Sequence, residues 1–127
     1  MIGILLVGVG SFIGGALRYG LSTWVHSVLD NPWFPYGTLA VNASGCLAIG
    51  FLAGLAETRM GFTAEARLFL FVGILGGFTT FSSFALETFS LARDTQSVAA
   101  LVNIGLQVVL GLLAVWVGHV LAHTMGG

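Results

Sequence analysis

Charge is what this sequence has least of. Only 7% of its 127 residues are charged, none of them is lysine, and hydrophobic residues make up 57%. The mean hydropathy is +1.00. These values lie outside the usual range for a soluble globular domain, so the composition predicts an integral membrane protein. With four basic residues in all, we expect no nucleic-acid partner.

Cysteine is nearly absent as well, and the usual catalytic sets are missing. The single cysteine, Cys46, excludes a disulfide framework within one chain and is expected to be a small buried hydrophobic residue. The sequence holds no carboxylate pair, Ser/His/Asp set, phosphate-binding glycine loop or cysteine cluster. We therefore predict that the protein is not an enzyme.

The few charged residues divide the chain into four apolar stretches. Each is about long enough to cross the roughly 30 Å hydrocarbon core of a bilayer as a helix. We predict one all-α transmembrane domain over residues 1–127, with spans at about 2–26, 36–57, 66–92 and 97–123. The first residues lack the positively charged start of a signal peptide and are taken as part of the first span. The three histidines, His26, His119 and His123, fall near span ends, so we expect interfacial anchors and no metal site on them.

The basic residues give almost no signal for orientation. Arg59 and Arg67 lie at one side of the predicted spans and Arg93 at the other. Orientation follows the excess of Lys and Arg in short loops, so the chain is expected to insert both ways. Four short spans also enclose little volume. We therefore predict an antiparallel, dual-topology homodimer in which a second copy completes the transport pathway.

The most unusual segment runs from Gly76 to Phe84 and puts two glycines, four hydroxyls and three aromatic rings into an apolar span. Such a segment is a poor helix, and backbone that leaves the helix inside a bilayer survives only where protein, water or an ion replaces its hydrogen bonds. We predict a break in the middle of the third helix. Phe81 and Phe84 would project from nearly one face, where their positive ring edges can solvate a small anion. Ser83 adds a hydroxyl donor.

Four other polar residues leave two interpretations open. Arg18 in the first span is either an interfacial residue that reaches water, or a fixed charge that draws in anions or binds carbonyls of a broken helix. Thr38 and Asn42 share one helical face, and Asn42 is either interhelical glue or a pore-lining donor, which we favour. Glu87 is either a functional carboxylate or an interfacial one. The same choice between polar track and helix glue applies to Asn103 and Gln107.

Three motifs together resemble the small bacterial fluoride channels called CrcB or Fluc. They are Gly-Gly-Ala-Leu-Arg-Tyr at 14–19, Gly-Thr-Leu-Ala-Val-Asn at 37–42 and Gly-Gly-Phe-Thr-Thr-Phe-Ser-Ser-Phe at 76–84, and the resemblance covers the whole chain. It implies a dual-topology antiparallel homodimer in the bacterial inner membrane, with two pores that carry fluoride out of the cytoplasm by passive electrodiffusion.

The resemblance also implies roles for individual residues. Phe81, Phe84 and Asn42 resemble the pore residues of that family. Gly76 and Thr79 resemble the residues whose backbone carbonyls, from both subunits, hold a structural sodium ion at the dimer centre. Thr38, Ser83 and Glu87 would line a polar track, and Arg18 would have a structural or vestibule role. These assignments are expectations from the resemblance.

Two other functions compete with a fluoride channel. A small proton-coupled multidrug exporter also has four short spans, but it needs a titratable carboxylate at the membrane centre, typically in the first helix. Here the first span carries Arg18, and Glu87 is the only acidic residue well inside a span. A non-transporting assembly subunit would leave the polar residues as helix glue.

Overall fold

The chain is all-helical in the computed structural model, which describes residues 1–59 and 61–126. No strand occurs within these residues. The helices are α1 (Ile2–Val28), α2 (Tyr36–Thr58), α3 (Ala64–Arg67), the π-helix η1 (Leu68–Leu75), α4 (Gly76–Phe78), α5 (Phe81–Arg93) and α6 (Ser97–Gly126). Four segments are long and apolar enough to cross a membrane, namely Ile2–Val28, Tyr36–Thr58, Ala64–Arg93 and Ser97–Met125. The predicted all-α class, with four helical segments able to span a membrane, is confirmed.

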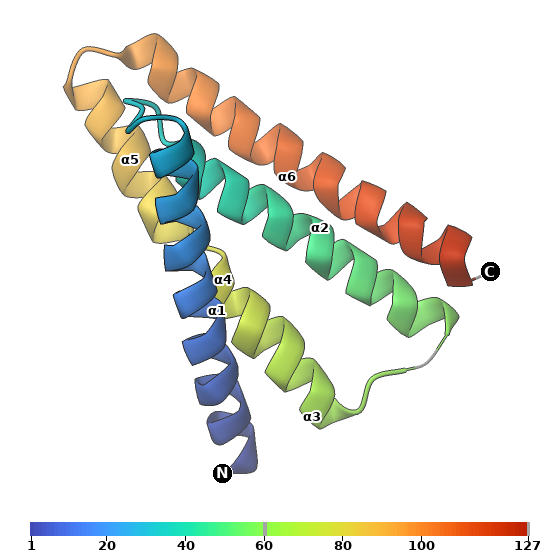
Figure 1. Ribbon diagram of the computed structural model, residues 1–127. Helices are drawn as coiled ribbons and strands as arrows, with labels where there is room; N and C mark the ends of the chain where they lie inside the picture. The colour runs from blue at the N-terminus through green and yellow to red at the C-terminus, as the bar shows by residue number, and fades with distance from the viewer. Residues whose placement is uncertain (60, 127) are drawn as a thin grey trace.

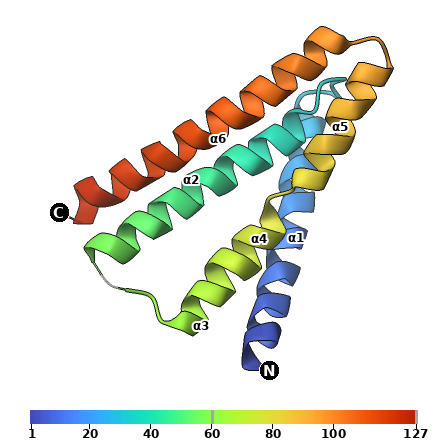
Figure 2. The same ribbon diagram turned by 180° about the vertical axis from the view of Figure 1, so that it is seen from behind.

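The helices associate as two pairs. In both ribbon views α2 runs alongside α6, and α1 crosses the third span against η1 and α4 (Figures 1 and 2). The link between α5 and α6 is short, which holds α5 against the start of α6. The third span therefore contacts α1 through its first half and α6 through its second half.

Glycines let the backbones of α2 and α6 approach closely. A Cβ atom at Gly50 would collide with the carbonyl oxygen of Val115, and one at Gly118 would collide with the carbonyl oxygen of Leu47. Close backbone approach through small residues is the common way for helices to associate in lipid, where no hydrophobic force drives them together. Asn42 and Gln107 belong to this closely packed pair.

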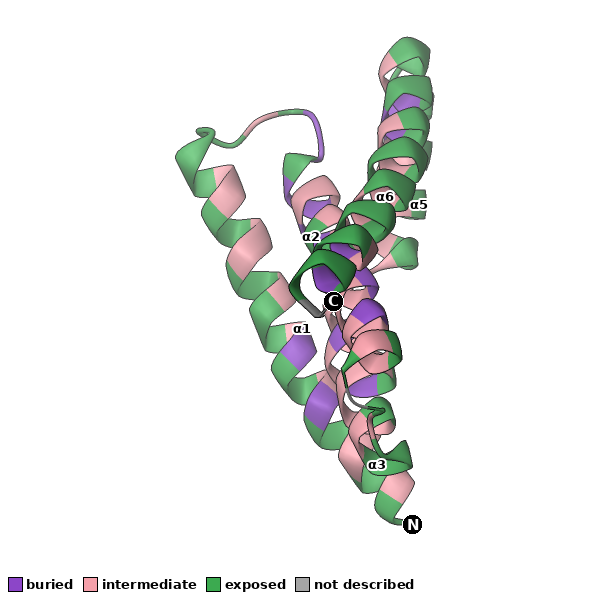
Figure 3. Cartoon of the chain, turned by 90° about the vertical axis from the view of Figure 1, so that its right-hand side faces the viewer, coloured by how far each residue is buried: buried purple, intermediate pink, exposed green. Residues whose placement is uncertain are grey.

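The interior of the single chain is small. Only a few apolar side chains are buried, including the cluster of Phe34, Leu91 and Ala100, and the largest fully buried side chains are Val41 and Asn103. Most helix surface is exposed or intermediate, as the burial colours show (Figure 3). Exposed apolar side chains are what a bilayer requires of the lipid-facing surface.

Regular helical backbone is interrupted once within the third span. Thr79 (φ −84°, ψ 158°) and Thr80 (φ −147°, ψ 117°) are extended, and the next helix begins at Phe81. The Thr80 hydroxyl accepts a hydrogen bond from Ser83 N at 3.1 Å and so caps α5. Gly76 to Thr80 therefore contains backbone groups that must find partners outside the helical ladder.

Candidate functional site

The Asn42 side chain holds the extended segment. Its Oδ1 accepts from Thr80 N at 2.8 Å, and its Nδ2 donates to Thr80 O at 3.0 Å. The same Nδ2 also donates to Gln107 Oε1 at 3.0 Å. One amide from α2 thus pairs with both backbone groups of Thr80 and connects them to α6. In this arrangement both Nδ2 hydrogens are engaged, as expected of interhelical glue.

Several carbonyls lose their helical donors at the interruption, and those of Gly76 and Thr79 are two of them. In a continuous helix Gly76 O would accept from Thr80 N, and Thr79 O would accept from Ser83 N. Here Thr80 N donates to Asn42 Oδ1 and Ser83 N donates to Thr80 Oγ1. The carbonyls of Gly76 and Thr79 are therefore freed from the helix, and these are the two carbonyls expected to hold a cation.

Arg18 contacts the same segment from α1. Its Nε donates to Gly77 O at 3.2 Å, which satisfies another carbonyl near the interruption. Gly14, one turn earlier in α1, lies so close to the third span that a Cβ atom there would collide with Ile74 O. This close approach places the Arg18 side chain beside Gly77. Of the interpretations left open for Arg18, carbonyl binding at a broken helix matches this contact.

A polar cavity of about 590 Å³ lies on one side of the interruption. It follows α1 from Arg18 to the end of that helix and is lined by Thr38, Thr80, Ser83 and Glu87. Thr38 is buried, and its hydroxyl donates to Glu87 Oε2 at 2.9 Å. Within the described part of the chain Glu87 Oε1 is buried without a partner. A carboxylate oxygen in such a position requires water, a proton or a further donor.

A second, largely apolar cavity of about 410 Å³ lies on the other side. It extends along α2 from Asn42 to Ile49 and along the third span back to Phe71. Phe81 and Phe84 line it with their ring centroids 5.5 Å apart and their planes tilted by 59°. Phe81 is 77% exposed in the single chain. Gly76 and Thr79 line the same cavity.

The expected site residues thus fall into two groups that meet at Thr80, which lines both cavities. Thr38, Ser83, Glu87 and Arg18 belong to the polar cavity, whereas Asn42, Phe81, Phe84, Gly76 and Thr79 belong to the apolar one. Thr38, Ser83 and Glu87, which were expected to line a polar track, all line the polar cavity. The sequence signal for a helix start at Phe81 is Thr80, a residue type preferred at helix N-caps.

The two amides of α6 join helices. Asn103 is fully buried and its Nδ2 donates to Thr88 Oγ1 at 2.9 Å. Gln107 accepts from Asn42, lines the apolar cavity, and has a buried Nε2 with no partner among the described residues. Sequence reasoning left Gln107 out of the site, although its position four residues after Asn103 marked it as facing the same way.

The histidines differ from expectation. His119 and His123 come together with Glu57, and their ligand-type atoms all lie within 4.8 Å of one another. The expectation that no histidines meet at metal-ligand spacing is therefore wrong for this pair. Two residues four apart share one helical face, and Gly54 lets α2 approach α6 at His119 and Ala122. His26 stands apart, and its Nε2 accepts from Gly37 N at 3.1 Å.

Comparison with known proteins gives a consistent result. The family described as "CrcB-like protein, Camphor Resistance (CrcB)" matches residues 5–119. A protein of Parabacteroides distasonis is 47% identical over 126 residues, covering 98% of this chain and 96% of its own length. One of Paramagnetospirillum magneticum is 48% identical over 124 residues, covering 96% of each. One of Methylocella silvestris is 46% identical over 120 residues, covering 93% and 91%. All three are named "Fluoride-specific ion channel FluC".

Proposed function

The chain belongs to the CrcB family, and from this membership and the geometry at Thr80 we propose that it is a fluoride-specific ion channel. It is a multi-pass membrane protein and not an enzyme. Fluoride leaves the cytoplasm by passive electrodiffusion, which lowers its toxic concentration in the cell. The organisms of the compared relatives are bacteria, which supports a place in the bacterial inner membrane.

The observation that carries the proposal is the position of Thr80 between two cavities. The polar cavity extends from Thr80 along α1, and the apolar cavity extends from Thr80 in the opposite direction along α2. Together they supply a route from either face toward the centre of the spans. We expect the short segment between the cavities to determine ion selectivity, because there an ion must exchange its water for protein groups.

The apolar cavity has the chemistry for a weakly held anion. The edges of Phe81 and Phe84 carry partial positive charge and no formal charge, and the unpartnered Nε2 of Gln107 supplies an amide donor beside them. No lysine is present to bind an anion too tightly. Conduction requires binding that is favourable enough to enter and weak enough to leave.

The freed carbonyls of Gly76 and Thr79 fit a small hard cation. Such ions bind oxygen ligands that are not already engaged in hydrogen bonds. Both carbonyls lack their helical donors, because Thr80 N donates to Asn42 and Ser83 N donates to Thr80. Two carbonyls from each of two copies would hold a sodium ion at the centre of a dimer. The ion would supply positive charge that fixes the interruption in place.

An antiparallel homodimer with two pores completes the proposal. Support comes from the weak orientation bias, from the 77% exposure of Phe81 at the mouth of the apolar cavity, and from the small interior of one chain. A second copy would cover the Phe81 ring and close the cavity. Each pore would then be lined by residues of both copies.

The test is fluoride efflux from liposomes that contain the purified protein, with valinomycin supplying potassium as counter-ion. We expect rapid fluoride release and no chloride release from matched chloride-loaded vesicles. If vesicles that contain protein shown to be dimeric by cross-linking release neither fluoride nor chloride, the proposal is overturned.

A further inference from the structure

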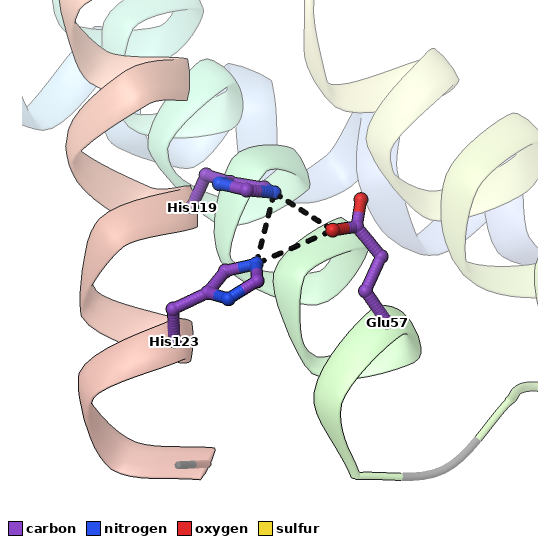
Figure 4. Close-up of side chains that lie close together, drawn as sticks. All are labelled: Glu57, His119 and His123. Atoms are coloured by element: carbon purple, nitrogen blue, oxygen red, sulfur yellow. Dashed lines mark hydrogen bonds and ion pairs between the residues drawn. The ribbon is translucent and has the colours of Figure 1, made fainter.

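Three ligand-type atoms converge at the end of the α2/α6 pair, away from the proposed pore. His119 Nε2 lies 3.1 Å from Glu57 Oε1, and His123 Nε2 lies 3.2 Å from the same oxygen. The two Nε2 atoms are 3.2 Å apart. Figure 4 shows both rings from α6 pointing toward each other and toward the carboxylate from α2.

While Glu57 is ionised, no arrangement of protons on the two imidazoles satisfies these three contacts together. A neutral imidazole carries a proton on one ring nitrogen only, and a carboxylate only accepts. If both Nε2 atoms donate to Glu57, two N–H groups face each other at the His119–His123 contact. If one Nε2 is unprotonated, its lone pair faces the lone pairs of Oε1. With an ionised Glu57 and no cation, one of the three contacts is therefore unfavourable.

From this geometry we propose that Glu57, His119 and His123 form a binding site for a divalent transition-metal ion of the zinc class. A tetrahedral ion bound at about 2.0–2.1 Å by each ligand holds neighbouring ligand atoms about 3.3 Å apart. The observed separations of 3.1 to 3.2 Å are close to that value without any rearrangement. A site with two histidines and one glutamate also leaves a fourth position for water.

The ligand set distinguishes this site from the proposed sodium site. Imidazole suits zinc, copper and nickel, whereas backbone carbonyls suit hard ions. The site is also open to solution, because the Glu57 side chain is 58% exposed and the His119 and His123 side chains are 39% and 43% exposed. Arg59 brings a positive charge to the same end, but its guanidinium is engaged with Met125 O at 3.2 Å.

Binding would join the C-terminal ends of two helices. Glu57 lies in the last turn of α2, and the histidines lie in the last turns of α6. Because an ion that binds only the folded state stabilises it by mass action, the metal would raise the melting temperature of the protein. Protons compete for imidazole nitrogens, so this stabilisation would weaken at acidic pH.

The test is metal binding to the purified, tag-free protein in detergent, with Zn²⁺ followed by competition with a chromophoric chelator and Co²⁺ by its visible absorption. We expect one ion per chain and the intense Co²⁺ bands of tetrahedral coordination. Loss of outer-shell partners alone costs about 10- to 100-fold in metal affinity, so H119A, H123A and E57Q should each lose at least about 100-fold.

The control is H26Q, which removes the one histidine outside the cluster and should leave Zn²⁺ affinity unchanged. Gel filtration and the melting temperature without metal report whether each variant folds, and E57Q preserves the shape of the side chain if an alanine variant does not. Equal Zn²⁺ affinity of wild type and the H119A/H123A double variant would overturn the proposal. Loss of binding in H26Q with retention in H123A would overturn it too.

Discussion

Among single residues, Asn42 makes the hydrogen bonds that hold the interruption of the third span. Its one amide pairs with Thr80 N, Thr80 O and Gln107 Oε1, so it replaces helical hydrogen bonds that the third span gives up. It also takes Thr80 N away from Gly76 O. The asparagine therefore creates the free carbonyl at Gly76 while it stabilises the interruption.

Replacing Asn42 by leucine should destabilise the protein and abolish fluoride efflux. A buried donor or acceptor left without a partner costs about 1–3 kcal/mol, and this change leaves Thr80 N, Thr80 O and Gln107 without theirs. The measurement is the melting temperature in detergent together with liposome efflux. The matched control is Ser44→Ala on the same helix, because the Ser44 hydroxyl donates only to carbonyls of its own helix. An Asn42→Leu protein with wild-type stability would contradict this assignment.

Replacing Phe81 or Phe84 by isoleucine should lower fluoride efflux and leave the dimer intact. Isoleucine keeps the bulk in the apolar cavity but removes the positive ring edges. Phe89→Ile is the control on the same helix, because Phe89 is exposed and lines neither cavity. Efflux is compared in liposomes at equal protein density. Undiminished efflux in both pore variants would remove the ring-edge mechanism.

Replacing Glu87 by glutamine distinguishes a channel mechanism from proton-coupled export. Glu87 accepts a hydrogen bond from Thr38, which a glutamine carbonyl can also accept. We expect the variant to conduct fluoride, because passive electrodiffusion needs no titrating group. The measurement is efflux with and without an imposed proton gradient. Complete loss of transport in a folded variant would favour proton coupling.

At the scale of elements, the approach of α1 to the third span rests on the absence of a side chain at Gly14. A Cβ atom there would collide with Ile74 O and lie 2.8 Å from Phe78 N, whereas at Gly15 nothing lies within 4 Å. The two positions are neighbours in sequence but differ completely in the space available. They offer a test of whether this helix contact positions Arg18.

Gly14→Ala should lower the melting temperature and efflux, and Gly15→Ala should change neither. Overpacking against backbone typically costs about 1–3 kcal/mol, and separation of α1 would also lengthen the Arg18 Nε to Gly77 O hydrogen bond. Both variants gain the same helix propensity from glycine to alanine, so the difference between them reports packing alone. Equal melting temperatures would contradict the contact.

The sequence predicted the positions of the four spans better than it predicted their local helix type and their packing. The four spans follow from the length of apolar runs between charged residues, which depends on the bilayer and not on tertiary contacts. The π-helix at Leu68–Leu75 could not be predicted, because an apolar run of this kind fits an α-helix equally well. The candidate site residues were chosen as polar or aromatic exceptions in apolar spans, and they line two cavities in the structure. Their division into two cavities depends on how α1 and α2 pack against Thr80, and no local pattern records that.

At the scale of the whole molecule, the proposed dimer depends on insertion in both orientations. Arg59 and Arg67 lie at the end of the spans that carries the α2–α3 link, and Arg93 lies at the opposite end. Because basic residues in short loops set orientation, a difference of about one arginine leaves both directions accessible. Few added charges should therefore fix the chain in one direction.

Glu65→Arg gives three arginines against one and should bias the chain one way, and the triple variant Arg67→Gln, Asp94→Arg and Gln96→Arg gives one against three and should bias it the other way. Each variant alone should lose efflux, because an antiparallel dimer needs both orientations, and co-expression of the two should restore it. Orientation is measured with a C-terminal reporter that is active only in the cytoplasm. A Glu65→Arg protein that has a single orientation and still conducts would contradict the antiparallel dimer.

The most extensive helix contact joins α2 to α6, and this has a consequence for how the protein is made. The ribosome completes α2 second and the 30 residues of α6 last, so α2 enters the bilayer before its partner exists. Until the third span is made Thr38 lacks Glu87 and Asn42 lacks Thr80, and until α6 is made Asn42 also lacks Gln107. The second helix is therefore made with these polar side chains unpaired, and they gain their partners only as the later helices follow. A chain whose synthesis stops before α6 would leave α2 without its most extensive helix contact and Asn42 without Gln107.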